Sequence, residues 1–124
     1  MRNNNINIKV ESDFIKESSS STVPIYLFSY NIEIYNKGVE EVQLLSRYWH
    51  IKDGSGHIEE IRGPGVVGLK PFIKPDELFK YSSYSPLKPP FGVMHGSFQM
   101  KNSDDSHFNV LIPPFSLTAP EYIN

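Results

Sequence analysis

The stretch that decides the fold of this chain is residues 96–112, which read GSFQMKNSDDSHFNVLI. If residues 102–106 form a turn, the two flanking segments pair as antiparallel strands. This register places apolar residues opposite one another on one face, in the pairs Met100–Phe108, Phe98–Val110 and Gly96–Ile112. The other face carries polar pairs, Lys101–His107 and Gln99–Asn109. A slip of one residue would mix the two faces, so the stretch predicts a half-buried hairpin in this register.

Outward from the hairpin, apolar and polar residues continue to alternate with period two, and no segment shows the helical period of about 3.6 residues. Turn signals at residues 36–38 and 53–56 separate the predicted strands, which are 6–10, 28–34, 45–52, 57–62 and a segment near 78–81. About seven strands in about 110 residues predict an all-β fold, an antiparallel β-sandwich of the immunoglobulin or fibronectin type III kind. In this scheme residues 45–52 form strand C, 57–62 form strand C′, and the hairpin forms strands F and G. Leu45, Trp49 and Ile51 are expected to share the buried face of strand C, with Trp49 at the core.

The length and composition predict a single domain over residues 1–124, of which the first 24 contain a first strand and a flexible serine-rich loop. The chain has no cysteine, which excludes disulfides, a thiolate nucleophile and a cysteine-based zinc site. The net charge is −2, with both signs scattered along the chain. Binding to nucleic acid normally requires a clustered basic surface, so no nucleic-acid partner is predicted.

The residues at the N-terminus lack the apolar segment of a signal peptide, and no apolar run approaches the length of a membrane span. We therefore expect a cytoplasmic protein without membrane insertion. None of the sequence motifs of nucleophilic hydrolases, zinc proteases or paired-carboxylate enzymes is present. The sequence accordingly predicts a protein without enzymatic activity and without a cofactor.

The segment Arg62-Gly63-Pro64-Gly65-Val66-Val67-Gly68 has the glycine spacing of a phosphate-binding loop. Pro71 and Pro75 follow too closely for the helix that such a loop normally opens. Successive backbone N–H groups in a glycine turn can still form a concave anion site without a helix. This predicts weak binding of pyrophosphate or a dinucleotide polyphosphate, a phosphate-rich small molecule, by Arg62, Gly63, Gly65, Gly68 and Lys70. The alternative is that the glycines only form a turn that requires positive φ, and that the charges are solvated.

The strand pattern places all four histidines on the outer face of the predicted C′-C-F-G sheet. In the expected register between strands C and C′, His50 lies opposite Glu59, and His57 is a diagonal neighbour of His50. These three side chains could then share a cobalt or zinc ion, since imidazole and carboxylate suit such metals. The alternative is that histidines on a solvent-facing sheet are ordinary polar surface.

Two proline-bearing connections, predicted at residues 63–75 and 82–92, carry aromatic residues that the strands do not obviously bury. These aromatics, Phe72, Tyr84 and Phe91, are the predicted contact residues for a protein partner, because exposed loops on a rigid sandwich are common interaction surfaces. The alternative is that the rings close the ends of the sandwich. Edge strands of such a fold can also pair between subunits, so a homodimer remains open.

Several stretches of this chain resemble the ApaG family: residues 42–49, 63–68, 79–83, 90–100 and 112–117. They extend over most of the chain and are specific as a set, and the departures at residues 69–71 and 75–77 affect no predicted strand. The resemblance implies a fibronectin type III-like sandwich and no established catalytic residues. It also implies links to cobalt resistance with magnesium efflux and to the neighbourhood of diadenosine tetraphosphate hydrolysis. Because the ApaG domain also occurs in F-box proteins, the resemblance further implies recognition of a protein partner.

Overall fold

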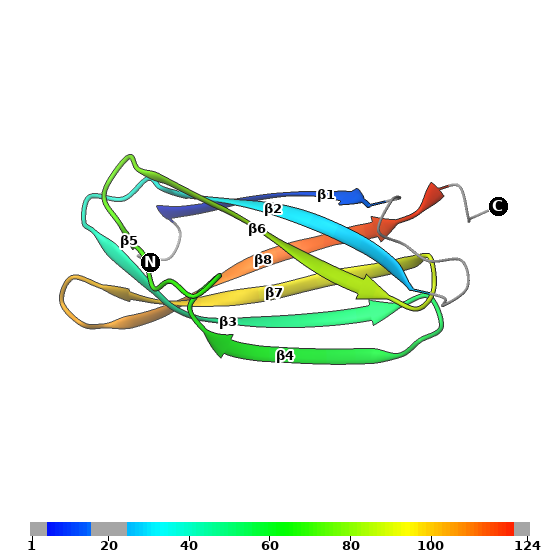
Figure 1. Cartoon of the computed structure of the whole chain (residues 1–124). Helices are drawn as coiled ribbons and strands as arrows, with labels where there is room; N and C mark the ends of the chain where they lie inside the picture. Colours follow the sequence, from blue (N-terminus) through cyan, green and yellow to red (C-terminus); the bar gives the residue numbers. More distant parts are fainter. Residues whose placement is uncertain (1–4, 16–24, 121–124) are drawn as a thin grey trace.

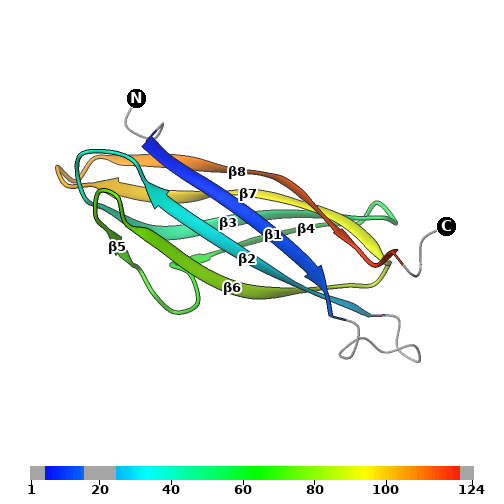
Figure 2. The same cartoon turned by 90° about the horizontal axis from the view of Figure 1, so that it is seen from above.

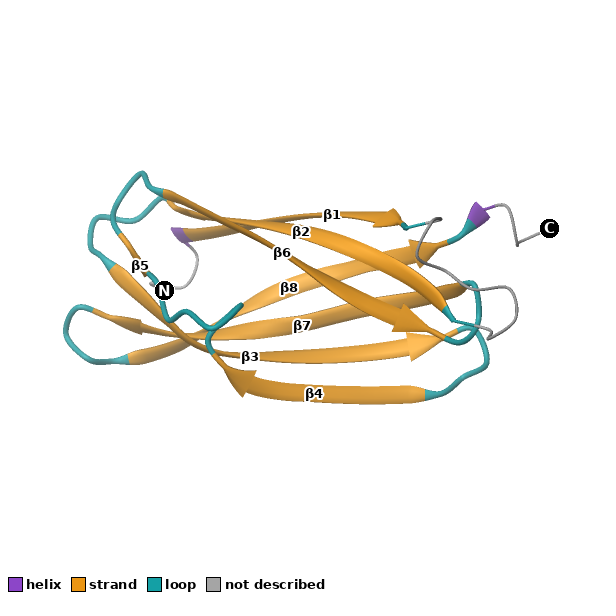
Figure 3. Cartoon of the chain, viewed as in Figure 1, coloured by secondary structure: helices purple, strands orange, loops and turns teal. Residues whose placement is uncertain are grey.

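The computed structural model in Figure 1 consists of two antiparallel β-sheets packed face to face. It describes residues 5–15 and 25–120, and strands account for most of this described chain (Figure 3). The serine-rich loop expected within the first 24 residues lies mainly outside the described residues. In the part that is described, the structure contains no helix with the length and apolar character needed to cross a membrane. The predicted all-β sandwich is confirmed.

One sheet contains three strands in the order β1-β2-β6, and the other contains five. The order along the larger sheet is β4-β3-β7-β8, with the short strand β5 pairing to β3 beyond the end of β4. The strands are β1 (Ile6–Phe14), β2 (Tyr26–Asn36), β3 (Val42–Asp53), β4 (Ile58–Pro64), β5 (Phe72–Ile73), β6 (Leu78–Leu87), β7 (Phe91–Asn102) and β8 (His107–Thr118). The predicted neighbours C′, C, F and G are therefore β4, β3, β7 and β8, in the expected order.

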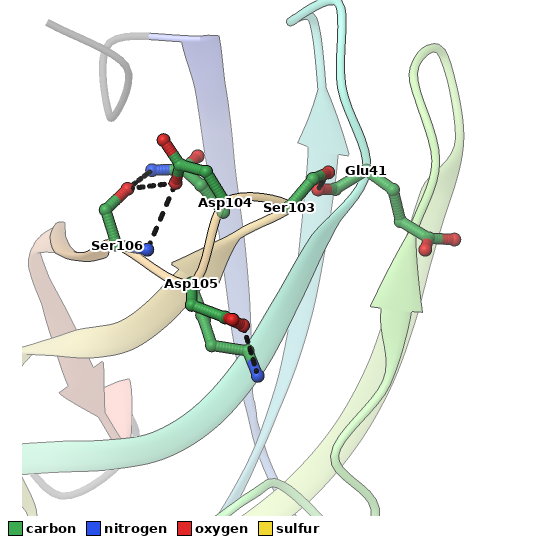
Figure 4. A network of polar contacts seen from close by, with 7 residues as sticks. Glu41, Ser103, Asp104, Asp105 and Ser106 are labelled. Atoms are coloured by element: carbon green, nitrogen blue, oxygen red, sulfur yellow. Dashed lines mark hydrogen bonds and ion pairs between the residues drawn. The ribbon is translucent and has the colours of Figure 1, made fainter.

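The register of the β7–β8 hairpin is as the sequence predicted, with Met100 opposite Phe108, Phe98 opposite Val110 and Gly96 opposite Ile112. Its turn is closed by a backbone hydrogen bond of 2.8 Å from the Asn102 N–H to the Ser106 carbonyl. Figure 4 shows the side chains of this turn, in which the Asp104 carboxylate accepts hydrogen bonds from the backbone N–H and the hydroxyl of Ser106. Serine and aspartate thus satisfy the turn locally, as these residues commonly do.

Trp49 lies in the core between the two sheets and is only 2% exposed. Its indole ring makes edge-on contacts with Tyr30 of β2 and Phe115 of β8, at centroid distances of 5.4 and 5.9 Å. Edge-to-face packing of this kind adds to the free energy gained by burying the ring area. The predicted role of Trp49 as the core tryptophan is confirmed.

The expectation that Leu45 shares the buried face of Trp49 and Ile51 is wrong. A β-bulge between Leu44 and Ser46 interrupts the pairing of β3 with β7. The extra residue at a bulge reverses the alternation, so Leu44 is fully buried and Leu45 only partly. A strict period of two cannot anticipate this reversal.

The two long sides of the sandwich differ. On one side β1 of the small sheet runs beside β8 of the large sheet (Figure 2), and the Ser12 hydroxyl donates a 2.8 Å hydrogen bond to the Ser116 carbonyl. On the other side β4 and β6 are the edge strands of their sheets. The sandwich therefore leaves the β4 and β6 edges without a neighbouring strand among the described residues.

Candidate functional site

The glycine segment after β4 forms a tight turn rather than an open loop. Val66 and Leu69 exchange two backbone hydrogen bonds, each 2.8 Å long. The two residues between them have positive φ, 44° at Val67 and 80° at Gly68. Positive φ at both central positions is the pattern of a type I′ hairpin turn, which normally takes asparagine or glycine first. Val67 is β-branched and therefore occupies a conformation that valine strongly disfavours.

Contacts outside this turn hold its backbone in place. The Gly65 N–H donates a 2.8 Å hydrogen bond to the Leu45 carbonyl beside the β3 bulge. The Arg47 guanidinium donates to the carbonyls of Pro64 and Gly65 at 3.1 and 2.9 Å. A Cβ atom on Gly65 would lie 2.1 Å from the Leu69 carbonyl oxygen, so only glycine fits. On the other side of the turn, the Leu44 N–H donates a 3.0 Å hydrogen bond to the Pro71 carbonyl, so the turn is bound to β3 on both sides.

Sequence reasoning did not single out Arg47, although a signal for it exists. Arg47 lies opposite Phe98 and Gly63 in the sheet, on the same face of β3 as Trp49. A charged residue in phase with buried residues needs a polar partner inside the fold. Here the partners are the two turn carbonyls.

Several groups of the predicted anion site already have partners within the protein. The N–H groups of Gly65, Val66 and Leu69 are engaged with carbonyls of the protein. Arg62 projects from β4 over the ring of Tyr48, with its guanidinium carbon 4.4 Å from the ring centroid. Gly63 lies in β4 and packs against Arg47. The donors that remain for an anion near the turn are the backbone N–H groups of Val67 and Gly68 and the side chain of Lys70. This set is smaller than the five residues that the sequence predicted.

The outer surface of the turn is apolar. The exposed fractions are 55% for Val67, 53% for Leu69 and 61% for Phe72 in the adjoining strand β5. Phe72 is therefore an exposed aromatic, as the partner-binding prediction requires. We call these three residues, Val67, Leu69 and Phe72, the apolar turn surface.

Tyr84 and Phe91 are exposed but lie away from this surface. Tyr84 is within β6, opposite Ser29, because β6 continues to Leu87 where the sequence predicted a loop from residue 82. Pro86 is tolerated in β6 because an edge strand can accommodate a residue without an N–H group. Phe91 begins β7 at the end of β3, near Gly54. The three predicted contact aromatics therefore do not form one surface.

The predicted register between β3 and β4 is off by one residue. His50 lies opposite Glu60, and Glu59 lies opposite Ile51. The reason is the turn after β3, where the Asp53 N–H pairs with the His57 carbonyl at 3.0 Å and Gly56 takes a φ of 91°. Three residues lie between Asp53 and His57, and the Asp53 carboxylate accepts hydrogen bonds from the N–H groups of Ser55 and His57. The Ser55 hydroxyl also donates to this carboxylate, and its hydrogen bond, together with the two from the N–H groups, lowers the pKa of Asp53.

This register separates the predicted metal ligands. His50 faces outward and stacks on His95 of β7, with ring centroids 4.6 Å apart. His57 and Glu59 instead line a hollow of about 430 Å³ between the sheets, together with Ile51, Asp53 and Lys88. Within residues 5–15 and 25–120, no group of three histidine or acidic residues is close enough to hold a metal ion. The structure therefore does not bring His50, His57 and Glu59 together.

The outer face of β3 and β4 carries a polar cluster that sequence reasoning missed. The Tyr48 hydroxyl donates a 2.5 Å hydrogen bond to the Glu60 carboxylate. This bond lowers the pKa of Glu60 and raises the pKa of Tyr48, so Glu60 is charged at neutral pH. Arg62 covers the same tyrosine ring. Only the correct β3–β4 register places Glu60 and Arg62 beside Tyr48.

The conformation of Val67 leads to a prediction about stability. Replacing Val67 with asparagine, the residue preferred before glycine in a type I′ turn, should stabilise the protein by about 1 kcal/mol. Urea unfolding followed by circular dichroism measures the change. Val39→Asn is the matched control, since Val39 is fully exposed and does not have positive φ. Equal shifts in both variants, or a loss of stability in Val67→Asn, would contradict the assignment of strain to Val67.

A family model, curated relatives and solved structures all relate this chain to the same family. Residues 16–102 match the family model described as ApaG domain. A curated relative, Protein ApaG of Parvibaculum lavamentivorans, is 44% identical over 115 residues, covering 93% of this chain and 88% of the relative. An X-ray structure from the Northeast Structural Genomics Consortium, target SoR45, superposes with a TM-score of 0.93 at 38% identity, covering 100% of this chain and 94% of that one. The putative ApaA protein from Bordetella pertussis superposes with a TM-score of 0.89 at 36% identity, covering 93% of this chain and 94% of that one.

Proposed function

Because the chain belongs to the ApaG family, we propose that it is a non-enzymatic binding module that recognises a protein partner through the apolar turn surface. The observation that carries this proposal is Val67, an exposed β-branched residue in a backbone conformation that asparagine or glycine would adopt more easily. Strained backbone conformations of this kind cluster at binding and active sites. Valine at this position makes the turn apolar at a cost in stability.

The chemistry of the surface suits a protein partner. Its three apolar side chains project from a backbone that is held by Arg47, the Leu45 carbonyl and the Val66–Leu69 hydrogen bonds. A preorganised surface loses little conformational entropy on binding, so more of the contact energy appears as affinity. Exposed apolar groups on a rigid turn are expected to act as anchors in a pocket of the partner.

Two other ligand classes were suggested by the sequence, and each has one supporting feature. Pyrophosphate could use the backbone N–H groups of Val67 and Gly68 with the Lys70 side chain, although Arg62 is engaged with Tyr48. A cobalt ion, in a cation-homeostasis role, could use the stacked pair His50 and His95. The Nδ1 atom of His50 is buried and has no hydrogen-bond partner in the described structure. Pyrophosphate and cobalt are ions, and binding of either one would not explain the exposed apolar side chains of the turn.

The test of the proposal is photocrosslinking followed by affinity measurement. A photoreactive amino acid at position 67 should capture a partner that the same amino acid at Leu111, an exposed site on β8, does not. The double variant Leu69→Ser/Phe72→Ser should then bind that purified partner at least about tenfold more weakly, the loss expected for two exposed anchors. Leu111→Ser is the matched control and should bind normally.

A partner that binds the double variant with unchanged affinity would contradict recognition through the apolar turn surface. Thermal unfolding with pyrophosphate or cobalt distinguishes the other two classes. Stabilisation by pyrophosphate that Lys70→Ala removes would favour the phosphate site, and stabilisation by cobalt that His95→Ala removes would favour the histidine pair.

A further inference from the structure

Strand β4 is an unprotected edge of the large sheet. It pairs with β3 on one side, and among the described residues no strand pairs with its other side, as Figure 1 shows. All of its residues except Gly63 are exposed, and the exposed fractions of Ile58 and Ile61 are 50% and 37%. An exposed strand edge with apolar side chains is a template for pairing with another strand. The edge strand β6 on the same side is less suited to pair with its own copy, because Lys80 is its one charged residue and it lacks an opposite charge to pair with it.

The two faces of β4 have different chemistry. Glu60 and Arg62 lie opposite His50 and Tyr48 on the outer face of the sheet. Ile61 lies opposite Trp49 on the inner face, next to the core. Suppose that β4 pairs with β4 of a second copy, related by a two-fold axis perpendicular to the sheet. The outer faces of the two sheets then form one continuous surface, and outer residues of β4 lie opposite outer residues of its copy. Only registers centred on a residue of β4 satisfy this condition, because a centre between two residues would pair opposite faces.

Charge distinguishes the three registers centred on Glu60, Ile61 and Arg62, the residues in the middle of β4. Centring the axis on Glu60 or on Arg62 places two like charges directly opposite each other, which is destabilising. Centring it on Ile61 places Glu60 opposite Arg62 of the second copy, and the same ion pair forms again on the other side of the axis. The same register places Ile61 opposite Ile61 and Ile58 opposite Pro64. Among these three registers, the strand is complementary to itself only in the one centred on Ile61.

From this complementarity we propose that β4 pairs antiparallel with β4 of a second copy of the chain, centred on Ile61, and joins the two large sheets into one. The charged side chains are already positioned for it, since Tyr48 donates its hydroxyl hydrogen bond to Glu60 and lies under the Arg62 guanidinium. The pairing leaves the apolar turn surface to its own partner, so this proposal goes beyond the proposed function and does not depend on it. A contact of one strand with its copy is small, so the dimer is expected to be reversible.

The experiment is sedimentation velocity of the whole chain over a range of micromolar concentrations, with native mass spectrometry to count subunits. The unmodified protein should shift from monomer to dimer as its concentration rises. Glu60→Arg and Arg62→Glu should each weaken the dimer at least tenfold, because each variant opposes like charges in the proposed register. An equimolar mixture of the two variants should form a heterodimer, because both cross-strand pairs then have opposite charges again. Lys80→Glu on β6 is the matched control and should dimerise normally.

Circular dichroism and thermal unfolding establish that each variant is folded, and Ile61→Lys provides a second variant that should abolish the dimer without reversing a charge pair. Three results would overturn the proposal. The first is an unmodified protein that stays monomeric throughout the concentration range. The second is a dimer that survives both charge reversals and Ile61→Lys. The third is a mixture of the two charge variants that forms no heterodimer, since the register centred on Ile61 requires one.

Discussion

Gly96→Ala should destabilise the protein by more than about 4 kcal/mol and leave most of it unfolded, the largest effect that we expect from a single substitution. Gly96 lies in β7 between Trp49 of β3 and Ile112 of β8. A Cβ atom at this position would lie 1.9 Å from the Tyr48 carbonyl oxygen and 3.0 Å from its carbonyl carbon. Both atoms belong to the backbone of the central strand β3, so they cannot move without breaking its pairing with β7. Urea unfolding followed by circular dichroism gives the change in free energy of unfolding.

Gly54→Ala is the matched control for this substitution. A Cβ atom on Gly54 would lie 3.4 Å from the Phe91 carbonyl oxygen, which is ordinary van der Waals contact, and Gly54 does not have positive φ. The free energy of unfolding of this variant should lie within about 0.5 kcal/mol of the value for the unmodified protein, as is usual for surface substitutions. A similar loss of stability in both variants would show that the close approach of β3 and β7 at Gly96 is not what requires glycine.

The second large effect is expected at Trp49, where alanine should cost about 3 to 5 kcal/mol, the range for removing a large buried aromatic ring. The cavity would open between Tyr30 and Phe115, which both contact the indole. Trp49→Phe should cost less than half as much as Trp49→Ala. The indole Nε1 is buried and has no hydrogen-bond partner in the described structure, and phenylalanine removes this unsatisfied donor while keeping a ring.

Unfolding of both Trp49 variants has to be followed by circular dichroism, because Trp49 is the sole tryptophan and its fluorescence disappears with it. If Trp49→Phe lost as much stability as Trp49→Ala, the indole N–H would contribute to the core, and removing it would not offset the lost volume. Leu44→Ala, at a fully buried aliphatic position on the same strand, provides the reference for a cavity without a polar group.

The β7–β8 hairpin and the β3–β4 hairpin show where prediction from sequence succeeds and fails. In the first, every pair on one face is apolar and nearly every pair on the other is polar, so a single register satisfies both faces. In the second, all but one residue of β4 is exposed, and neither face constrains the pairing. There the register depends on the turn, in which the Asp53 carboxylate accepts hydrogen bonds from Ser55 and His57 and Lys52 lies opposite Ile58 instead of His57. Because the predicted register was wrong by one residue, Glu59 was expected opposite His50, where the structure has Glu60.

The sequence by itself determined the fold class, the order of the four strands in the large sheet, the register of the terminal hairpin and the burial of Trp49. Alternation of apolar and polar residues encodes these features because each sheet must bury one face and expose the other. Only the tertiary structure decided the bulge at Leu44, the hydrogen bonds of Arg47 and the positive φ of Val67. These depend on contacts between residues far apart in the chain, such as Gly65 with Leu45 and Arg47 with Pro64. A pattern along one strand records which face is buried, whereas the backbone of a turn is set by the groups that the rest of the fold brings against it.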